Sequence, residues 1–353
     1  MKKILNPYSI SLIFFVTLLS IIGIISSVSL SVVYPNTYIR QLVSVAIGYL
    51  LMIFFAFFDH HILQKFAKIS TFILFLLLLY LLFQGGVSRF INFGVFNFQP
   101  SQFAYIVLSL LIAKIFSNKI KDDELTKVFL VSLVLIGVFS LLISLEPDMG
   151  SAAQLFLTCF LTLVIIGMPL LHIFVFSTFS IVSFLLLLGF SEEWRRRIEA
   201  FLNPEAFATS DALQTLQSIK AFARGGINGV GFLKGIFKYP QVLPVSVSDF
   251  VLPVIGEELG GIVIIIIAVS YLGLLYTGFR IASVAQSLFS RILAIGLTLG
   301  ICMFATINFA VNLGLMPVTG VPLPFISMGF NNMVANFISV GILINISRKE
   351  VGE

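Results

Sequence analysis

The chain has 353 residues and a mass of 39.0 kDa; 59% of its residues are hydrophobic and only 10% are charged. So few charges cannot cover the surface of a soluble protein of this size, which excludes the soluble globular class. The formal net charge of +5 therefore reflects membrane topology, and nucleic acid is not an expected partner. The two cysteines, Cys159 and Cys302, lie in apolar runs, so neither a disulfide framework nor a cysteine metal site is predicted.

Apolar runs long enough to cross a bilayer recur along the whole chain. The first run follows Lys2 and Lys3 as a signal peptide would, but nine more runs follow it, so we interpret it as a retained helix. The predicted fold class is an all-α polytopic membrane protein, formed by a single integral membrane domain over residues 1–353. About ten transmembrane helices are expected, at residues 9–30, 41–58, 66–83, 101–116, 127–145, 151–168, 170–190, 253–279, 290–311 and 322–346.

Basic residues are distributed unevenly between the short loops, and this distribution predicts the orientation. With the N-terminus in the cytoplasm, twelve lysines and arginines fall on the inner side, and only Arg40 and Arg89 fall on the outer side. We therefore expect both termini to be cytoplasmic and the number of spans to be even. His60, His61 and His172 also fall on the inner side, apart from any carboxylate cluster, and we interpret them as loop residues rather than ligands.

The longest polar segment, residues 191–252, is predicted to form a large extracytoplasmic loop between spans seven and eight. Within it, residues 194–202 and 211–224 each place apolar side chains on one helical face, as interfacial amphipathic helices do. The glycines of residues 225–235 match neither nucleotide-binding fingerprint. They predict either a flexible turn or a cradle in which backbone N–H groups, with Arg224 and Lys234, bind a phosphorylated lipid headgroup.

Several carboxylates lie where spans meet the outer side. Asp249 either caps the helix that follows it or serves as a general base on a sugar hydroxyl, and the two roles are compatible. Glu146 and Asp148 form a very short outer turn, which is either solvated or part of a site. Glu257 and Glu258 come near the start of a span, where ionisable groups usually face a cavity or a partner. Asp148, Asp249 and Glu257 are candidate oxygen ligands of a divalent cation, although no spacing enforces such a site.

Residues 312–327 contain two glycines and three prolines, too many for a regular helix. Non-helical backbone at membrane depth is tolerated only where protein buries it or where it lines a cavity. We therefore predict a re-entrant or capping loop over a hydrophilic site.

A set of motifs runs in order along the chain: Arg40 Gln41, Arg89 Phe90 Ile91, Phe98 to Ser101, Glu146 to Gly150, Arg197 Ile198, Gln214 to Ser218, Gly225 Gly226 with Gly229 and Gly231, Asp249 Phe250, Ile255 to Gly260, and Gly314 to Ser327. Over essentially its whole length the chain resembles the SEDS (shape, elongation, division and sporulation) proteins, the RodA and FtsW group of peptidoglycan polymerases. Val318 Thr319 Gly320 and the short tails are more similar to the RodA branch.

The resemblance implies a glycosyltransferase that polymerises lipid II, an undecaprenyl-diphosphate-linked precursor, into β-1,4 glycan strands during cell wall synthesis and elongation. The enzyme would work at the outer face of the bacterial cytoplasmic membrane. Asp249 matches the family's catalytic aspartate and would deprotonate the acceptor hydroxyl. Positive charge is needed at the leaving diphosphate, from arginines, loop cations or a divalent cation, Mg²⁺ or Mn²⁺. The candidate substrate-binding residues are Arg40, Arg89, Gln99, Ser101, Asp148, Arg224, Lys234, Glu258 and Ser327.

The resemblance also implies partners: membrane lipid and a single-span transpeptidase of the class B penicillin-binding protein type. The resemblance to the family also implies that the partner docks on spans eight and nine, where Gly273, Gly278, Gly296 and Gly300 could permit close helix approach. Two other functions stay open. Many spans without a nucleotide motif would also suit a lipid II transporter, or flippase. A catalytically weak scaffold for the transpeptidase is the other alternative.

The sequence departs from the family pattern at three places, which favour the scaffold. Gln102 and Tyr105 stand where the family has a glutamate and a lysine, so two charges are lost together and neither is left unpaired. Val245 and Val247 replace polar neighbours of the predicted base, and Met328 to Asn332 alter a loop near the cavity. We expect these changes to affect the rate more than the fold.

Overall fold

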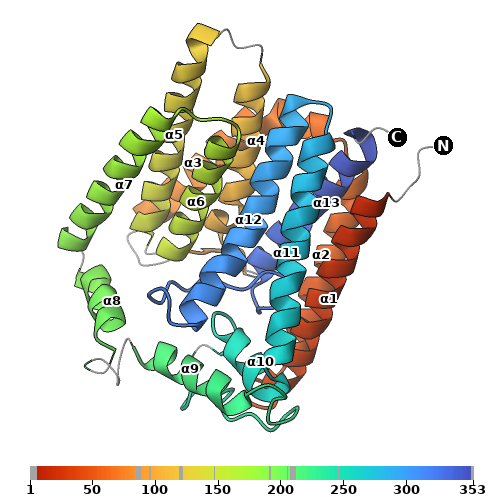
Figure 1. Cartoon of the computed structure of the whole chain (residues 1–353), viewed down its shortest axis with the longest axis vertical. Coiled ribbons are helices and arrows are strands. Elements are labelled where there is room, and N and C mark those ends of the chain that lie inside the picture. Colours follow the sequence, from red (N-terminus) through yellow and green to blue (C-terminus); the bar gives the residue numbers. More distant parts are fainter. Residues whose placement is uncertain are drawn as a thin grey trace.

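The computed structural model describes residues 6–84, 89–94, 97–118, 122–146, 148–190, 192–204, 206, 212–244 and 246–350. Long helices stand side by side as a bundle, and the two chain ends lie together at its upper end in Figure 1. Two short helices, α8 (Glu192–Leu202) and α9 (Leu213–Gly225), lie at the opposite end of the bundle. The predicted long loop therefore lies at the end of the molecule away from the termini, and its two amphipathic helices are present.

Among the described residues, eight helical stretches are long and apolar enough to cross a membrane, and two shorter apolar helical stretches are α6 and the Leu170–Ser183 part of α7. Together they agree with the expected ten spans and with an all-α polytopic membrane fold. The helices are α1 (Pro7–Leu30), α2 (Thr37–Phe57), α3 (His60–Phe83), α4 (Ala104–Ser117, preceded by the 3₁₀ turn η1, Pro100–Phe103), α5 (Asp122–Leu145), α6 (Met149–Ile165), α7 (Leu170–Phe190), α11 (Gly261–Val284), α12 (Leu288–Asn312) and α13 (Phe330–Glu350).

Two predicted spans have different limits from those observed. The span expected at 253–279 is two helices, α10 (Val251–Leu259) and α11, because Gly260 breaks them with a φ of 82°. A Cβ at Gly260 would lie 2.3 Å from the Ile227 carbonyl oxygen, so the break also lets the long loop pack closely. The last span begins at Phe330 rather than at 322, since prolines keep residues 313–329 out of a helix.

Helices α12 and α13 form the centre of the bundle. In the 18-residue stretch of each helix that could span the membrane, 83% and 89% of the residues, respectively, are buried inside the protein. Small residues allow helices of the bundle to approach one another, and these include all four glycines predicted to dock a partner. A Cβ would meet Phe15 from Gly273, Thr298 from Gly278, Ser109 from Gly296 and Tyr105 from Gly300, each at 2.4 Å or less. The docking prediction based on these glycines is wrong, because they pack helices of the same chain.

Candidate active site

A short hairpin brings the first group of predicted site residues together. Strand β1 (Ile91–Asn92) pairs antiparallel with β2 (Asn97–Phe98), with Ile91 opposite Phe98. This pairing places Arg89, before β1, near Gln99, after β2, although ten residues separate them. The hairpin therefore places the Arg89 guanidinium and the Gln99 amide at the end of the bundle where the turn before α6 lies.

Asp148 is the centre of this group and is 2% exposed. Its Oδ2 accepts hydrogen bonds from Gln99 Nε2 and Ser101 Oγ, both at 2.7 Å. Its Oδ1 accepts from the Ser151 backbone N–H at 3.3 Å, which caps α6, and lies 3.7 Å from Arg89 Nη1. Four predicted substrate-binding residues thus form one connected cluster: Arg89, Gln99, Ser101 and Asp148.

Asp249 lies beside this cluster, on a backbone held by two amides of α12. The Asp249 carbonyl oxygen accepts from Asn308 Nδ2 at 2.9 Å and Asn312 Nδ2 at 3.0 Å, both on α12. A Cβ at Gly320 would lie 3.4 Å from Asp249 Oδ2 and 4.0 Å from Arg89 Nη1. The carboxylate and the guanidinium therefore meet around Gly320, in the irregular segment 313–329, as expected for a loop over a hydrophilic site.

The surroundings of Asp249 favour a role in chemistry over a role as a helix cap. Helix α10 begins at Val251 with Phe250 at its N-cap and no side-chain capping bond, so the capping alternative is wrong. Burial raises the pKa of Asp249, the Ser248 hydrogen bond and the Arg89 charge oppose this rise, and the Asp148 charge adds to it. A carboxylate with a raised pKa is a stronger base than an ordinary aspartate.

Glu146 is buried as well, at 3% exposed, so the solvated-turn interpretation of Glu146 and Asp148 is wrong. Burial, followed by the neighbouring Asp148 charge, raises the pKa of Glu146 to about 8. Neither carboxyl oxygen has a hydrogen-bond partner among the described residues. Glu146 is therefore protonated at neutral pH and does not compete with Asp148 for Arg89.

Glu257 and Glu258 belong to a different cluster, at the end of α10. Glu257 pairs with Arg224 and accepts from the backbone N–H groups of Ile236 and Phe237, both at 2.9 Å. Glu257 therefore faces the segment of residues 224–237. For this reason the structure does not assemble the expected cation site from Asp148, Asp249 and Glu257.

Glu258 is held by even more donors than Glu257. It accepts from Ser29 Oγ at 2.7 Å and Lys238 Nζ at 2.9 Å, and from the backbone N–H groups of Leu233 and Gly235 at 3.2 Å. The backbone donors predicted to bind a lipid phosphate are thus occupied by the chain's own carboxylates. Residues 225–235, which we call the glycine loop, do not form a flexible turn either, since the Val230 N–H donates a hydrogen bond to the Glu257 carbonyl at 2.9 Å.

The remaining predicted binding residues lie in varied surroundings. Ser327 is 2% exposed, and its hydroxyl donates to the Ser248 carbonyl at 2.5 Å and accepts from Leu323 N–H at 2.8 Å, so it anchors the loop. Arg40 and Lys234 are exposed, on α2 and on the glycine loop. A cavity of about 260 Å³ lies between α8, α9 and residues 314–318, lined mainly by apolar side chains and by Arg197.

Two of the three departures from the family pattern contact one another. Gln102 Nε2 donates to Ser151 Oγ at 2.9 Å, and Gln102 Oε1 accepts from Asn332 Nδ2 at 2.9 Å. The Tyr105 hydroxyl lies 2.8 Å from Ser339 Oγ. A neutral hydrogen-bonded network therefore stands where the family has charges, and Val245, at the third departure, lies outside the described residues.

The assignment of the three histidines to loops is wrong, because His60 and His61 lie on α3 and His172 lies on α7. His60 is the first residue of α3 and 1% exposed, and with His61 it lies beside Glu350. Within the part of the chain that the structure describes, these three residues are the one group of potential metal ligands close enough to share an ion. His172 lies separately, on α7.

Sequence reasoning missed the two asparagines that hold the Asp249 backbone. Asn308 and Asn312 are four residues apart in an otherwise apolar helix, so they lie on one face. Uncharged amides at membrane depth are also costly to bury without partners, and that signal could have identified them.

Comparisons with known proteins agree with this arrangement. The family model for cell cycle proteins of the FtsW, RodA and SpoVE type matches residues 9–351. The probable peptidoglycan glycosyltransferase FtsW of Trichlorobacter lovleyi is 34% identical, over 97% of this chain and 94% of its own length. Peptidoglycan glycosyltransferase MrdB of Escherichia coli K12 is 28% identical, over 87% of this chain and 84% of its own. A chain of a peptidoglycan synthase complex shares the fold, with a TM-score of 0.79, 24% identity and 96% of each chain covered.

Proposed function

Because the chain belongs to the FtsW, RodA and SpoVE family of cell cycle proteins, we propose that it is a peptidoglycan glycosyltransferase that polymerises lipid II. The observation that carries the proposal is the meeting of Asp249, Arg89 and Asp148, which come from three distant segments of the chain. The relative with 34% identity is named FtsW, so assignment to the RodA branch stays a prediction.

The proposed reaction is an inverting displacement at the donor sugar. The Asp249 carboxylate takes the proton of the acceptor 4-hydroxyl, whose oxygen forms a bond to the donor anomeric carbon. The bond from that carbon to the diphosphate oxygen breaks, and undecaprenyl diphosphate leaves. Arg89, 40% exposed and held near Asp148, offers positive charge to the diphosphate as negative charge develops there.

A divalent cation is not part of this scheme. Both Asp148 oxygens already accept hydrogen bonds, and Glu257 is held by Arg224 and the glycine loop. The residues present do not fit the three-carboxylate site that the sequence suggests, so no step is assigned to a metal ion.

The decisive experiment is polymerisation of lipid II by purified Asp249→Asn protein. The amide keeps the size of the side chain but removes its basicity, so we expect the rate to fall by roughly 10² to 10⁴-fold. Asp59→Asn is the matched control, because Asp59 lies near the chain ends, paired with Lys349 at 2.7 Å. An Asp249→Asn protein that polymerises at the wild-type rate would contradict the proposal.

A catalytically weak scaffold is the second candidate, favoured by the neutral network around Gln102 and Tyr105. The same gel assay separates the two functions. A scaffold yields no glycan strands from lipid II even at high protein concentration, whereas a polymerase yields strands that the Asp249→Asn control lacks.

We also infer that the chain ends are cytoplasmic and that α8 to α10 lie on the outer side. Basic residues support this orientation, because Lys349, Arg348, Lys65 and Lys114 gather at the end that carries the termini. Cysteines at exposed Lys234 and Gln286, in a chain without Cys159 and Cys302, provide the test. We expect a membrane-impermeant thiol reagent to label position 234 from outside and position 286 only after the inner membrane is lysed.

The proposed transpeptidase partner must dock on a surface other than the four glycines, which pack against helices of the same chain. Helix α11 presents one exposed apolar stripe, formed by Ile262, Ile265, Val269, Leu272 and Tyr276. In lipid such a stripe binds by close packing rather than by hydrophobic burial. We propose that the partner's single span packs there, and a bulky Leu272→Trp variant should then lose the partner on co-purification while retaining lipid II polymerisation.

A further inference from the structure

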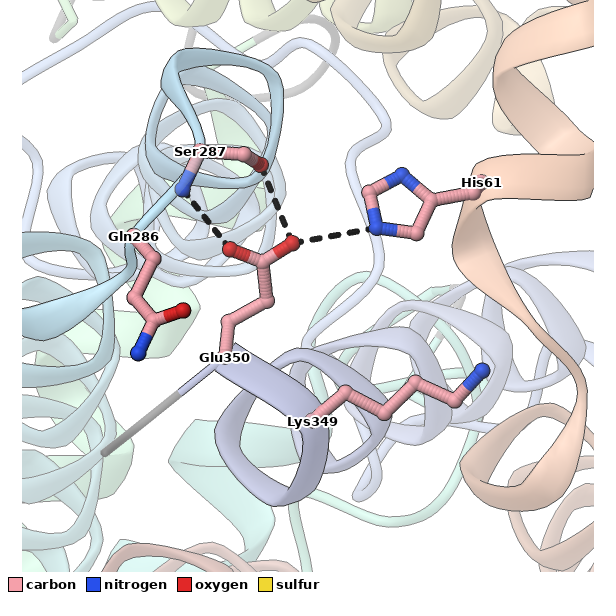
Figure 2. Close-up of a pocket in the computed structure, with 5 residues that line it drawn as sticks. All are labelled: His61, Gln286, Ser287, Lys349 and Glu350. Atoms are coloured by element: carbon pink, nitrogen blue, oxygen red, sulfur yellow. Dashed lines mark hydrogen bonds and ion pairs between the residues drawn. The ribbon is translucent and has the colours of Figure 1, made fainter. Parts of the chain in front are cut away.

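Three helix ends meet at the end of the bundle that carries the termini. His60 and His61 begin α3, Glu350 ends α13, and Ser287 lies just before α12. Figure 2 shows the His61 ring directed at the Glu350 carboxylate, which also accepts two hydrogen bonds from Ser287. An open pocket lies over this group, lined by His61, Gln286, Ser287, Lys349 and Glu350.

The two imidazoles and the carboxylate converge on a small volume. Glu350 Oε1 lies 3.1 Å from His61 Nε2 and 3.4 Å from His60 Nε2, and the three ligand atoms all lie within 4.8 Å of one another. Two ligands bound at about 2.1 Å to a tetrahedral ion lie roughly 3.4 Å apart. The observed separations are therefore close to those of a two-histidine, one-carboxylate ion site.

The tautomer of His60 suits a metal ligand. Asn345 Nδ2 donates to the Ala56 carbonyl at 2.9 Å, which directs Asn345 Oδ1 toward His60. His60 Nδ1, 2.6 Å from that oxygen, must then carry the proton, so Nε2 presents a lone pair. A metal-bound histidine commonly donates its other ring N–H to an oxygen acceptor in this way. The Nε2 lone pair faces the Ser290 hydroxyl at 2.8 Å and Glu350 Oε1 at 3.4 Å, and a bound ion would take the place of the Ser290 hydrogen bond.

The charges around the group also suit a cation. Lys349 extends away from the Glu350 carboxylate in Figure 2, and its ammonium pairs with Asp59 at 2.7 Å. Arg348 donates to the Ala56 carbonyl and stacks over Phe57, with its guanidinium 4.3 Å from the ring centroid. The nearby cations are therefore engaged elsewhere. Among the described residues, the Glu350 carboxylate accepts only from neutral donors besides the histidines, Ser287 and the Ser290 hydroxyl at 2.9 Å, so it keeps its negative charge, and an ion bound at Oε1 would replace the serine hydroxyl bonds there.

We propose that His60, His61 and Glu350 bind one divalent transition-metal ion of the Zn²⁺ type. The ion completes its coordination with water on the side of the open pocket. The ligands come from the start of α3 and the end of α13. The ion therefore links two helices that are distant in the sequence, since His61 and Glu350 are 289 positions apart. This site lies at the opposite end of the bundle from Asp249, so it is independent of the proposed transferase activity.

The test is titration of the intact, detergent-purified protein with Co²⁺ alone, followed by displacement with Zn²⁺. The affinity tag must contain no histidine, because the chain has only three histidines of its own. We expect one Co²⁺ per chain, visible absorption of a low-coordinate ion, loss of that absorption on adding Zn²⁺, and a rise in the thermal midpoint with Zn²⁺.

Substitutions identify the ligands. His61→Ala changes a side chain that is 47% exposed, and we expect it to weaken Co²⁺ binding more than tenfold and to abolish the Zn²⁺-dependent rise in thermal midpoint. Glu350→Gln should weaken binding similarly, while His172→Ala, the matched control on α7, should leave binding unchanged. Absence of saturable binding to the wild type, or equal binding by wild type and His61→Ala, would overturn the proposal.

Discussion

Asp249 and Glu258 lie nine positions apart at the same end of the bundle, yet their surroundings differ completely. Glu258 accepts from a serine, a lysine and two backbone N–H groups. Asp249 has Ser248 and the charge of Arg89 beside it and remains partly exposed. Donors that stabilise an anion make it a weaker base, so the number of donors distinguishes a structural carboxylate from a reactive one.

The glycine loop is the source of this difference. Its backbone N–H groups point at Glu257 and Glu258, and a Cβ at Gly235 would lie 2.7 Å from Glu257 Oε2. Successive backbone N–H groups bind anions well, and here the anions belong to the chain itself. Among the residues that the structure describes, no comparable row of backbone N–H groups faces Asp249, whose backbone carbonyl, rather than its carboxylate, is held by Asn308 and Asn312.

The largest expected effect on stability comes from Glu258→Gln. Lys238 is 1% exposed, and removing its partner's charge leaves a buried ammonium unpaired. We expect the free energy of unfolding to fall by about 3–5 kcal/mol, read as a lower thermal midpoint in detergent. Asp249→Asn, in contrast, should change the midpoint little. Equal stability of Glu258→Gln and wild type would remove the distinction between the two carboxylates.

Gly229→Ala tests whether close packing of the glycine loop supports the Glu258 cluster. Gly229 has a φ of 77°, and a Cβ there would lie 2.3 Å from the Glu258 carbonyl oxygen. Backbone strain and overpacking together should lower the free energy of unfolding by about 3 kcal/mol. The control is Gly137→Ala on α5, where a Cβ meets nothing within 4 Å and stability should be kept or slightly raised.

Glu146→Gln tests a third kind of carboxyl group, which differs from those of Asp249 and Glu258 because it is buried and protonated. The folded state holds the Glu146 proton up to a pKa of about 8, whereas the unfolded state loses it near the ordinary value of 4.5. The free energy of unfolding of the wild type should therefore fall as pH rises from about 5 to 8, by about 3–4 kcal/mol, and then level off. Thermal midpoints across this range should show no such fall for Glu146→Gln; parallel curves for the two proteins would contradict the assignment.

Tyr105→Phe should have the smallest effect, because the network around Tyr105 is neutral. The lost hydroxyl leaves Ser339 Oγ with its bond to the Ala335 carbonyl at 3.0 Å. We expect a loss of about 1 kcal/mol in the free energy of unfolding and an unchanged rate of lipid II polymerisation. A loss as large as that of Glu258→Gln would mean that the neutral network and the charged cluster are equally important for folding.

The fold class, the family and the ten apolar helices could be predicted from the amino-acid sequence alone. Each depends on local composition over about 20 residues or on motifs in a fixed order, and neither needs long-range contacts. Arg89, Gln99, Ser101 and Asp148 were also expected at one site. The short-range β1–β2 pairing brings Arg89 near Gln99 and Ser101, whereas Asp148, at the start of α6, joins them only through helix packing.

Side-chain partners were decided only by the tertiary structure. Nothing near Glu258 in the sequence indicates Ser29, and nothing near His60 indicates Glu350, because helix packing joins residues more than 200 positions apart. A carboxylate next to a span has the same local pattern whether it binds substrate, a lysine or a row of backbone N–H groups. Its role depends on which donors the packed helices and loops bring within about 3 Å, and those distances exist only in the folded chain.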